Sequence, residues 1–235
     1  MLNLDKRRKT AIKNYPIRVV GKECISFPTL DRSANYHFSI SPNAAKESIK
    51  KALFVKKGKK ICVNYSILPI DSFVAKYGKP SIETQKDDDL SKYINGGIAE
   101  KEHVNGIAKT NIVFYRKKIL GYFTLRLTTI HTTIQINNKS NAYEGCEILR
   151  AGTPIVELLM YARDDNNNKL PMKIVFKKEV LPRVKKLIKL VGTKDLYLEC
   201  DEKIANVYEK LGFRAYADFF VDGTRMLAML RPIEL

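Results

Sequence analysis

The strongest constraint on the fold is one β-α-β unit in the second half of the chain. Residues 154–161 form a nearly continuous apolar run, which is typical of a central strand buried on both faces. A long basic segment over 171–190 has the pattern of a helix, and 196–200 is again strand-like. A helix that joins two consecutive strands implies that these strands are parallel. The pattern therefore predicts a sheet with a parallel centre.

Antiparallel strands are predicted on both sides of this unit. Two apolar runs, 110–115 and 119–129, are separated by three basic residues, which favours a hairpin. A second hairpin is predicted for 213–221 and 224–230, around Asp222-Gly223. With a first strand over 61–65, the complete order is β-α-α-β-β-β-α-β-α-β-β. The fold class predicted is a mixed α/β sheet.

Helix signals are found between these strands. Serine is favoured at the N-cap of a helix and proline at its first position. Ser41-Pro42 therefore predicts a helix from Pro42 to Val55. Pro182 lies inside the helix predicted over 171–190 and should kink or split it, because proline lacks an N–H and crowds the preceding turn. Residues 131–153 have no periodicity, which predicts a long loop. Two further helices are predicted, over 70–77 and over 87–95.

Positive charge is concentrated near the start of the chain. The net charge is +17, and residues 1–60 hold 15 basic and 4 acidic side chains, whereas 61–235 hold 27 and 21. Such asymmetry fits contact with a polyanion, although a solvated basic surface accounts for it equally well. Gly58 lies among four lysines and is the predicted boundary. We therefore expect a basic N-terminal extension over 1–58 and one domain over 59–235.

Several classes of protein are excluded by the residue pattern. Four cysteines and three histidines are scattered along the chain, whereas zinc ligands normally lie two to four residues apart. The N-terminus has charges but no apolar segment after them, so disulfide formation in an export pathway is not expected. No run approaches about 18 apolar residues, the length that a membrane helix needs. We expect a cytoplasmic protein without a metal.

Three segments together carry a resemblance to a known family. Residues 201–213 place an aspartate before a helix that ends in Tyr-Glu-Lys-Leu-Gly-Phe. Residues 119–125 read Ile-Leu-Gly-Tyr-Phe-Thr-Leu, and 154–164 form an apolar strand that ends in Tyr-Ala-Arg-Asp. In order and spacing, residues 60–231 resemble the GNAT acetyltransferases. A Gly-Tyr-Phe strand before a long loop is most similar to the toxin-type subgroup, which acetylates aminoacyl-tRNA.

The resemblance implies a GNAT-like acyl-CoA N-acyltransferase fold and assigns catalytic roles. In the family the fourth and fifth strands splay apart. Backbone groups of Leu159, Met160 and Tyr161 would then pair with the pantetheine amides of acetyl-CoA and polarise the thioester carbonyl. Tyr208 would protonate the departing thiolate as a general acid. Glu157 is the carboxylate best placed to take a proton from the attacking amine.

Each of these side chains also has a structural interpretation. Tyr208 lies at helical spacing from Ala205 and Leu211 and can pack in the core. Glu157 can be a strand residue without a catalytic role. Asp201 and Asn206 would touch the cofactor in the family arrangement, but Asp201 is equally accounted for as a helix N-cap.

The phosphate-binding loop departs from the family pattern. That loop reads Gln/Arg-x-x-Gly-x-Gly/Ala, but no glycine occurs over 153–191 in this chain. Asn168 takes the place of the first residue, and Pro171 has no N–H to offer a phosphate. Lys169 and Lys173 could replace hydrogen bonds with charge. The resemblance thus implies acetyl-CoA as cofactor, bound weakly for the family.

Two functions from different classes follow. The first is acetyl-CoA-dependent N-acetyl transfer to an amine, on aminoacyl-tRNA or protein, with tRNA or another nucleic acid contacted through residues 1–60 and the helix 171–190. The alternative is a GNAT-fold protein that has lost cofactor binding and acts as a nucleic-acid-binding or regulatory module. The segments that select the acceptor in the family, here about 69–98 and 131–153, contain no readable signature.

Overall fold

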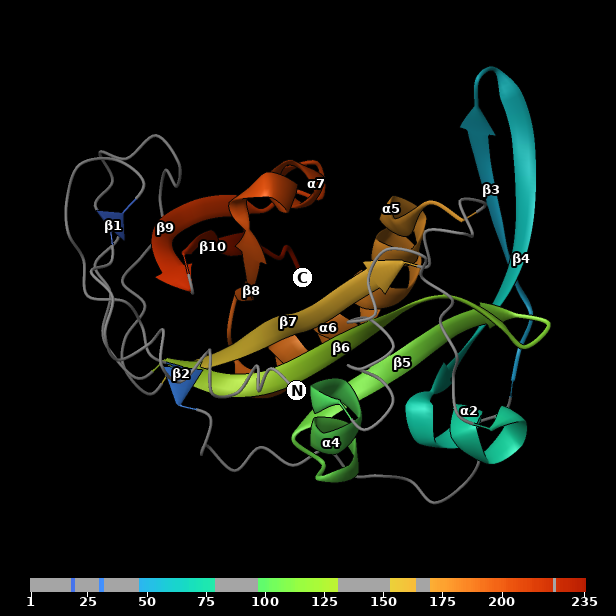
Figure 1. Cartoon of the computed structure of the whole chain (residues 1–235), viewed down its shortest axis with the longest axis horizontal. Helices are drawn as coiled ribbons and strands as arrows, with labels where there is room; N and C mark the ends of the chain where they lie inside the picture. Colours follow the sequence, from blue (N-terminus) through green and yellow to red (C-terminus); the bar gives the residue numbers. More distant parts are fainter. Residues whose placement is uncertain are drawn as a thin grey trace. The chain divides into compact units, whose positions relative to one another are not determined.

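The chain divides into two compact units in its computed structural model (Figure 1). The structure describes residues 18–19, 30–31, 47–78, 97–130, 153–163, 170–221 and 223–235. The first unit comprises Met1–Asn35, Leu127–Glu157 and Val184–Leu235, and the second comprises Tyr36–Arg126 and Leu158–Arg183. Strands β6 and β7 contribute residues to both units.

The second unit contains antiparallel strands joined by tight turns. Strand β3 pairs with β4, β4 with β5, and β5 with β6. Helices α2 and α4 lie between β4 and β5 in the chain, and the helical run after β7 begins in this unit. The elements are β3 (Lys50–Lys56), β4 (Lys59–Pro69), α2 (Ile70–Tyr77), α4 (Ile98–Val104), β5 (Ala108–Tyr115), β6 (Lys118–Ile130), β7 (Pro154–Arg163), α5 (Met172–Val175) and the π-helical turn η1 (Phe176–Val180).

The hydrophobic core of the second unit is built from α2 and its neighbouring strands. Phe73 of α2 contacts Phe114 of β5 with the ring centroids 5.0 Å apart and nearly perpendicular. Aromatic pairs of this geometry add to the stabilisation from burial. Apolar side chains of α2, β4, β5 and β6 complete the core: Leu68, Ile70, Ile112, Ile119 and Tyr122.

The first unit holds the parallel pairing that the β-α-β pattern predicts. β7 pairs with β8 in parallel at Val156–Leu196 and Glu157–Tyr197. β10 pairs antiparallel with both β8 and β9, β1 with β9, and β2 with the end of β6. The elements are β1 (Arg18–Val19), β2 (Leu30–Asp31), most of α6 (Leu181–Val191), β8 (Asp195–Asp201), the 3-10 turn η2 (Glu202–Ile204), α7 (Ala205–Glu209), β9 (Arg214–Val221) and β10 (Thr224–Pro232).

Most of the predicted elements after residue 60 are confirmed. The mixed α/β sheet, the strands around the basic helix and both hairpins are present, and helix 70–77 has the predicted bounds. The strand predicted over 61–65 is the middle of the longer β4. The helix predicted over 87–95 and the loop over 131–152 lie outside the described residues.

The helix predicted over 42–55 is wrong where the structure describes it. Residues 50–55 belong to strand β3, which pairs along its whole length with β4. Ala52 is fully buried while Leu53 is exposed, so the burial follows the two-residue period of a strand. The Lys57-Gly58 turn has a positive φ at both residues, as in a type I′ hairpin turn. The boundary predicted at Gly58 falls in this turn.

Two helical features were not foreseen. Helix α4 begins directly after Gly97, which the sequence predicts only as the end of an earlier helix. The helical run from Met172 to Val191 continues through Pro182 without a break in the chain of helical turns, and the turn η1 before this proline is π-helical. This wider turn lies directly before Pro182, where a regular α-helix would require an N–H that proline lacks.

Gly121 of β6 allows close approach to β7. A Cβ atom at this position would lie 2.5 Å from the carbonyl oxygen of Ala162. We expect Gly121→Ala to lower the free energy of unfolding by about 2–3 kcal/mol, because backbone must move to accommodate the methyl group. For a chain of this size the melting temperature should fall by roughly 2–4 °C per kcal/mol.

The matched control is Gly58→Ala in the β3–β4 turn. A Cβ atom at Gly58 would have no other atom within 4 Å, and the φ of this residue is +76°. The control should cost about 1 kcal/mol, from the positive φ alone. A melting temperature of Gly121→Ala at or above that of the control would contradict the expected cost of the β6–β7 contact.

Candidate active site

Tyr208 lies on α7, directly before the turn that leads into β9. The backbone carbonyl of Tyr208 accepts hydrogen bonds from the N–H groups of Leu211 at 2.9 Å and Phe213 at 3.1 Å. Gly212 has a φ of +89° and permits this turn. The ring of Phe213 thereby contacts the Tyr208 ring edge-on, with the centroids 6.0 Å apart. The Tyr-Glu-Lys-Leu-Gly-Phe spacing is therefore what fixes the tyrosine ring.

The environment of Tyr208 keeps its phenol protonated. Burial raises the pKa of Tyr208 well above its usual value of 10, and the adjacent Cys200 contributes further. A neutral phenol carries a proton that it can donate, but the raised pKa makes it a weaker acid than an exposed tyrosine. The role of Tyr208 as a general acid stays a prediction.

The neighbouring thiol is unsuited to covalent catalysis. Cys200 is buried at the end of β8, with its sulfur 3.6 Å from the sulfur of Met229. Burial, together with the nearby carboxylates of Asp201, Glu209 and Glu199, raises the pKa of this thiol to about 12. Only a thiolate is an effective nucleophile, so Cys200 is not suited to form a covalent intermediate.

Three of the predicted site residues lie on one segment of the first unit, from the end of β8 through α7: Asp201, Asn206 and Tyr208. Asp201 ends β8, and its carboxylate accepts a hydrogen bond from the Lys203 N–H at 2.8 Å, which is the N-cap geometry. Asn206 is exposed on α7, two residues before Tyr208. Glu157 lies in the same unit but in the β7–β8 ladder, with none of its surface exposed. Its role as a base stays a prediction.

The second unit holds the predicted backbone contacts on β7. Leu159 is buried, and the side chain of Met160 packs against the core cluster. The hydroxyl of Tyr161 donates a hydrogen bond to the Met172 carbonyl, and its ring contacts that of Phe176 at 5.9 Å. The side chain of Tyr161 thus ties β7 to the beginning of the helix that follows.

The groups at the start of this helix determine how well the chain could bind the phosphates of a coenzyme. Pro171 is the N-cap residue, and its carbonyl accepts from the N–H groups of Ile174 and Val175 at 2.9 and 3.4 Å. Lys173 in the first turn is exposed. One exposed ammonium group and the first helical N–H groups suit a phosphate, although Pro171 contributes no donor. Asn168 and Lys169 lie outside the described residues.

Solved structures resemble the chain over most of its length. The crystal structure of AtaTR bound with AcCoA is 18% identical, with a TM-score of 0.53 over 72% of this chain and 94% of that one. The crystal structure of a tyrosine-to-phenylalanine mutant of KacT is also 18% identical, with a TM-score of 0.51 over 72% and 95%. The crystal structure of a bacterial toxin is 14% identical, with a TM-score of 0.51 over 80% of this chain and 92% of that one.

The chain has a GNAT-type fold. At these identities the likeness concerns the fold, and it agrees with the strand order that the sequence predicts. No family model matches the sequence, and no curated protein does either.

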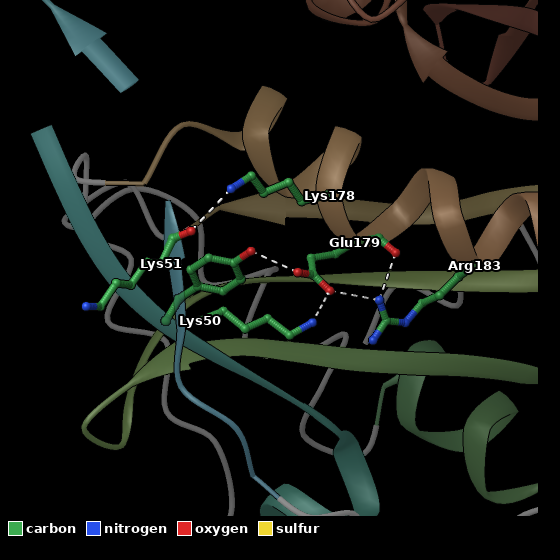
Figure 2. A network of polar contacts seen from close by, with 6 residues as sticks. Lys50, Lys51, Lys178, Glu179 and Arg183 are labelled. Atoms are coloured by element: carbon green, nitrogen blue, oxygen red, sulfur yellow. Dashed lines mark hydrogen bonds and ion pairs between the residues drawn. The ribbon is translucent and has the colours of Figure 1, made fainter. Parts of the chain in front are cut away.

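A buried carboxylate in this GNAT-type fold was missed by sequence reasoning. Glu179 of η1 is 2% exposed and accepts hydrogen bonds from Lys50 at 2.7 Å, Tyr65 at 2.8 Å and Arg183 at 2.9 Å (Figure 2). Burial alone would raise the pKa of Glu179, but these three donors outweigh it and lower the pKa below its usual value. Only the i, i+4 spacing of Glu179 and Arg183 was visible in the sequence.

A second cluster of buried polar side chains lies between α4 and the strands β5 and β6. Arg126 of β6 pairs with Glu102 at 2.7 Å, and both are buried. His103 accepts a hydrogen bond from the Thr110 N–H at 3.2 Å, and its Nε2 lies 3.4 Å from a carboxylate oxygen of Asp71. Burial lowers the pKa of His103 despite the nearby Asp71. These residues join α2 and α4 to β5 and β6.

Among the described residues, no group of three or more His, Cys, Asp or Glu side chains could hold a metal ion. No helix in these parts of the chain is long and apolar enough to span a bilayer.

Proposed function

We propose that the protein is an acetyl-CoA-dependent N-acetyltransferase that acts on an amine. The observation that carries this proposal is Tyr208: its ring is fixed by the α7–β9 turn of a GNAT-type fold, and its phenol stays protonated. Acetyl-CoA, when bound, supplies an acetyl group activated as a thioester.

The residues of this chain have distinct tasks in that reaction. Lys173 and the first N–H groups of α5 would bind phosphate, and Tyr161 holds this helix start against β7. Backbone groups of Leu159, Met160 and Tyr161 would orient the cofactor. Tyr208 holds a proton on its phenolic oxygen and would donate it to the leaving sulfur. The attacking amine would lose its proton to Glu157 or to water.

Pro171 supports a second candidate function. A proline as N-cap, in a segment without glycine, makes a poorer phosphate cradle than the family loop. A GNAT-fold protein that no longer binds the cofactor would act as a nucleic-acid-binding or regulatory module. The two candidates differ in one measurable property, the affinity for acetyl-CoA.

Calorimetry with acetyl-CoA separates the two candidates. We expect saturable heat from the full chain, with an affinity that Pro171→Gly increases, because glycine restores an N–H at the N-cap and freedom to turn it. Pro232→Gly, at the end of β10, is the matched control and should leave the affinity unchanged. No heat up to millimolar acetyl-CoA would reject the acetyltransferase and favour the second candidate.

The acceptor is proposed to be the amino group of aminoacyl-tRNA. The supports are the resemblance of the Gly-Tyr-Phe strand to the toxin-type subgroup and the basic charge of residues 1–60 and of the helix 171–190. Incubation with labelled acetyl-CoA and either aminoacyl-tRNA or peptides with free N-termini tests this point. Label found in the peptides alone would make a protein the acceptor.

A further inference from the structure

The hairpin of β3 and β4 carries an unusual concentration of charge. Its segment 50–60, here called the basic hairpin, contains six lysines, and no acidic residue occurs over 48–70. Within the second unit, the hairpin extends well beyond strands β5 and β6, and its turn lies at the far end (Figure 1). Residues 55–60 are all exposed.

The pairing register distributes these cations over both faces of the ribbon. Lys56 and Lys59 are cross-strand partners on the face that carries Ala52. Lys60 is the partner of Val55 and therefore lies on the opposite face. Lys57 occupies the turn itself. The end of the hairpin thus presents positive charge on both faces and in its turn.

The terminal lysines are not neutralised within the described part of the chain. No carboxylate there forms an ion pair with Lys56, Lys57, Lys59 or Lys60. The β5–β6 turn of the same unit is also basic, but its cations lie over aromatic rings of the chain. Its Arg116 lies over the ring of Tyr115 at 5.3 Å, and its Lys117 lies over that of Tyr77 at 5.9 Å.

Contacts with η1 hold the base of the basic hairpin in place. Lys50 of β3 and Tyr65 of β4 both bind Glu179, and Lys178 donates a hydrogen bond to the Lys51 carbonyl at 3.2 Å (Figure 2). Both strands are therefore fixed to one helical turn. An arm that is fixed before binding loses little conformational freedom on binding, which favours affinity.

The order of residues along the hairpin limits what it can bind. A second copy of the chain would bring like charges together, which is unfavourable. A membrane-inserting hairpin would need apolar side chains at its end, but Leu53 and Val55, which are 71% and 66% exposed, lie behind the lysines. Cations on both faces are complementary to anionic walls on both sides. The major groove of a B-form duplex lies between two phosphate backbones, and it admits a two-stranded ribbon.

We propose that the basic hairpin inserts into a groove of double-stranded nucleic acid, with Lys56, Lys57, Lys59 and Lys60 contacting phosphates on both walls. This inference does not depend on acetyl transfer. Both DNA and RNA duplexes have two phosphate backbones, but the wide major groove of B-form DNA admits a two-stranded ribbon whereas the narrow major groove of A-form RNA does not, so the expected ligand is DNA.

Fluorescence anisotropy with the full chain tests the proposal. The probes are a labelled DNA duplex, an RNA duplex of the same sequence and the corresponding single strands, each titrated between about 50 and 200 mM salt. Two variants remove the same number of charges from the two basic turns of the second unit. The hairpin variant carries Lys57→Gln, Lys59→Gln and Lys60→Gln, and the control carries Arg116→Gln, Lys117→Gln and Lys118→Gln.

We expect the wild type to bind the DNA duplex more tightly than the RNA duplex and the single strands, because only the B-form major groove is wide enough for the ribbon. The hairpin variant should bind DNA about tenfold or more weakly, and its salt slope should fall by about 1 for each lysine removed. The control should keep the wild-type slope.

Three results would overturn the proposal: equal slopes for the hairpin variant and the wild type, equal loss in both variants, or single strands or the RNA duplex bound as tightly as the DNA duplex. Displacement of the duplex by anionic vesicles or polyglutamate at equal charge concentration would instead indicate a non-specific polyanion surface and would also overturn it. Calorimetry of the hairpin variant with acetyl-CoA keeps the two proposals apart, because cofactor affinity should not change.

Discussion

Tyr208→Phe is expected to lower the turnover of acetyl transfer by about 10²-fold or more, the usual scale for a positioned general acid. The phenylalanine ring preserves the edge-on contact with Phe213, so only the phenolic hydroxyl group is lost. The affinity for acetyl-CoA should therefore change little. Turnover is measured by release of free coenzyme A thiol, and affinity by calorimetry.

Tyr115→Phe provides the matched control, because it removes a hydroxyl from a partly exposed tyrosine of β5. This variant should keep wild-type turnover. Full activity of Tyr208→Phe would reduce Tyr208 to a packing residue of α7. A loss of thermal stability parallel to the loss of activity would point to the same conclusion.

Glu179→Ala is expected to lower the free energy of unfolding by about 2–3 kcal/mol. The substitution leaves the buried Tyr65 hydroxyl without its acceptor and separates two cations from their carboxylate. The side chains of Lys50 and Arg183 are 37% and 36% exposed, so water can partly rehydrate them and the loss stays below that of a fully buried pair. Urea unfolding measures the change.

Glu179→Gln separates the charge of this side chain from its shape. Because the folded state lowers the pKa of Glu179, ionisation stabilises the protein above the usual value of 4.5, and this contribution is lost as the pH falls through the lower, folded value. We expect the wild type to lose stability in that window, and the glutamine variant to lose less. Identical pH profiles, or a Glu179→Ala loss below about 0.5 kcal/mol, would contradict this account.

The elements that sequence reasoning predicted correctly have strong local signals. Residues 154–161 form a nearly continuous apolar run, which is typical of a buried strand, and helix α2 has a proline before it and a glycine after it. Asp201 was predicted as an N-cap, and the bond to Lys203 confirms that geometry. In each case the residues that determine the structure are close together in the chain.

The errors have a common physical cause. Ala52 and its neighbours carry a helix-like composition after Ser41-Pro42, yet pairing with β4 places residues 50–56 in a strand. Tertiary context often overrides such weak local preferences. Helix α4 was missed because Gly97 reads as the end of a helix, whereas a glycine also serves as an N-cap.

Long-range contacts were beyond the sequence altogether. Glu179 is separated by 129 residues from Lys50 and by 114 from Tyr65, so no spacing rule could link them. The same holds for the position of the Tyr161 hydroxyl on the Met172 carbonyl, which depends on how β7 leads into the helix. For Tyr208, by contrast, a motif of six residues was sufficient to select the residue, although its ring contact with Phe213 came only from the structure.

The π-helical turn at Phe176–Val180 has a consequence for insertions and deletions of residues in this segment. A π turn holds one residue more than the α-helical turn that it replaces. A chain that lost this residue would return to a regular α-helical turn, in which proline at 182 would leave a carbonyl without its N–H partner. An insertion or deletion is usually tolerated in loops, but in this segment the extra residue is accommodated within a helix and brings Glu179 to the hairpin.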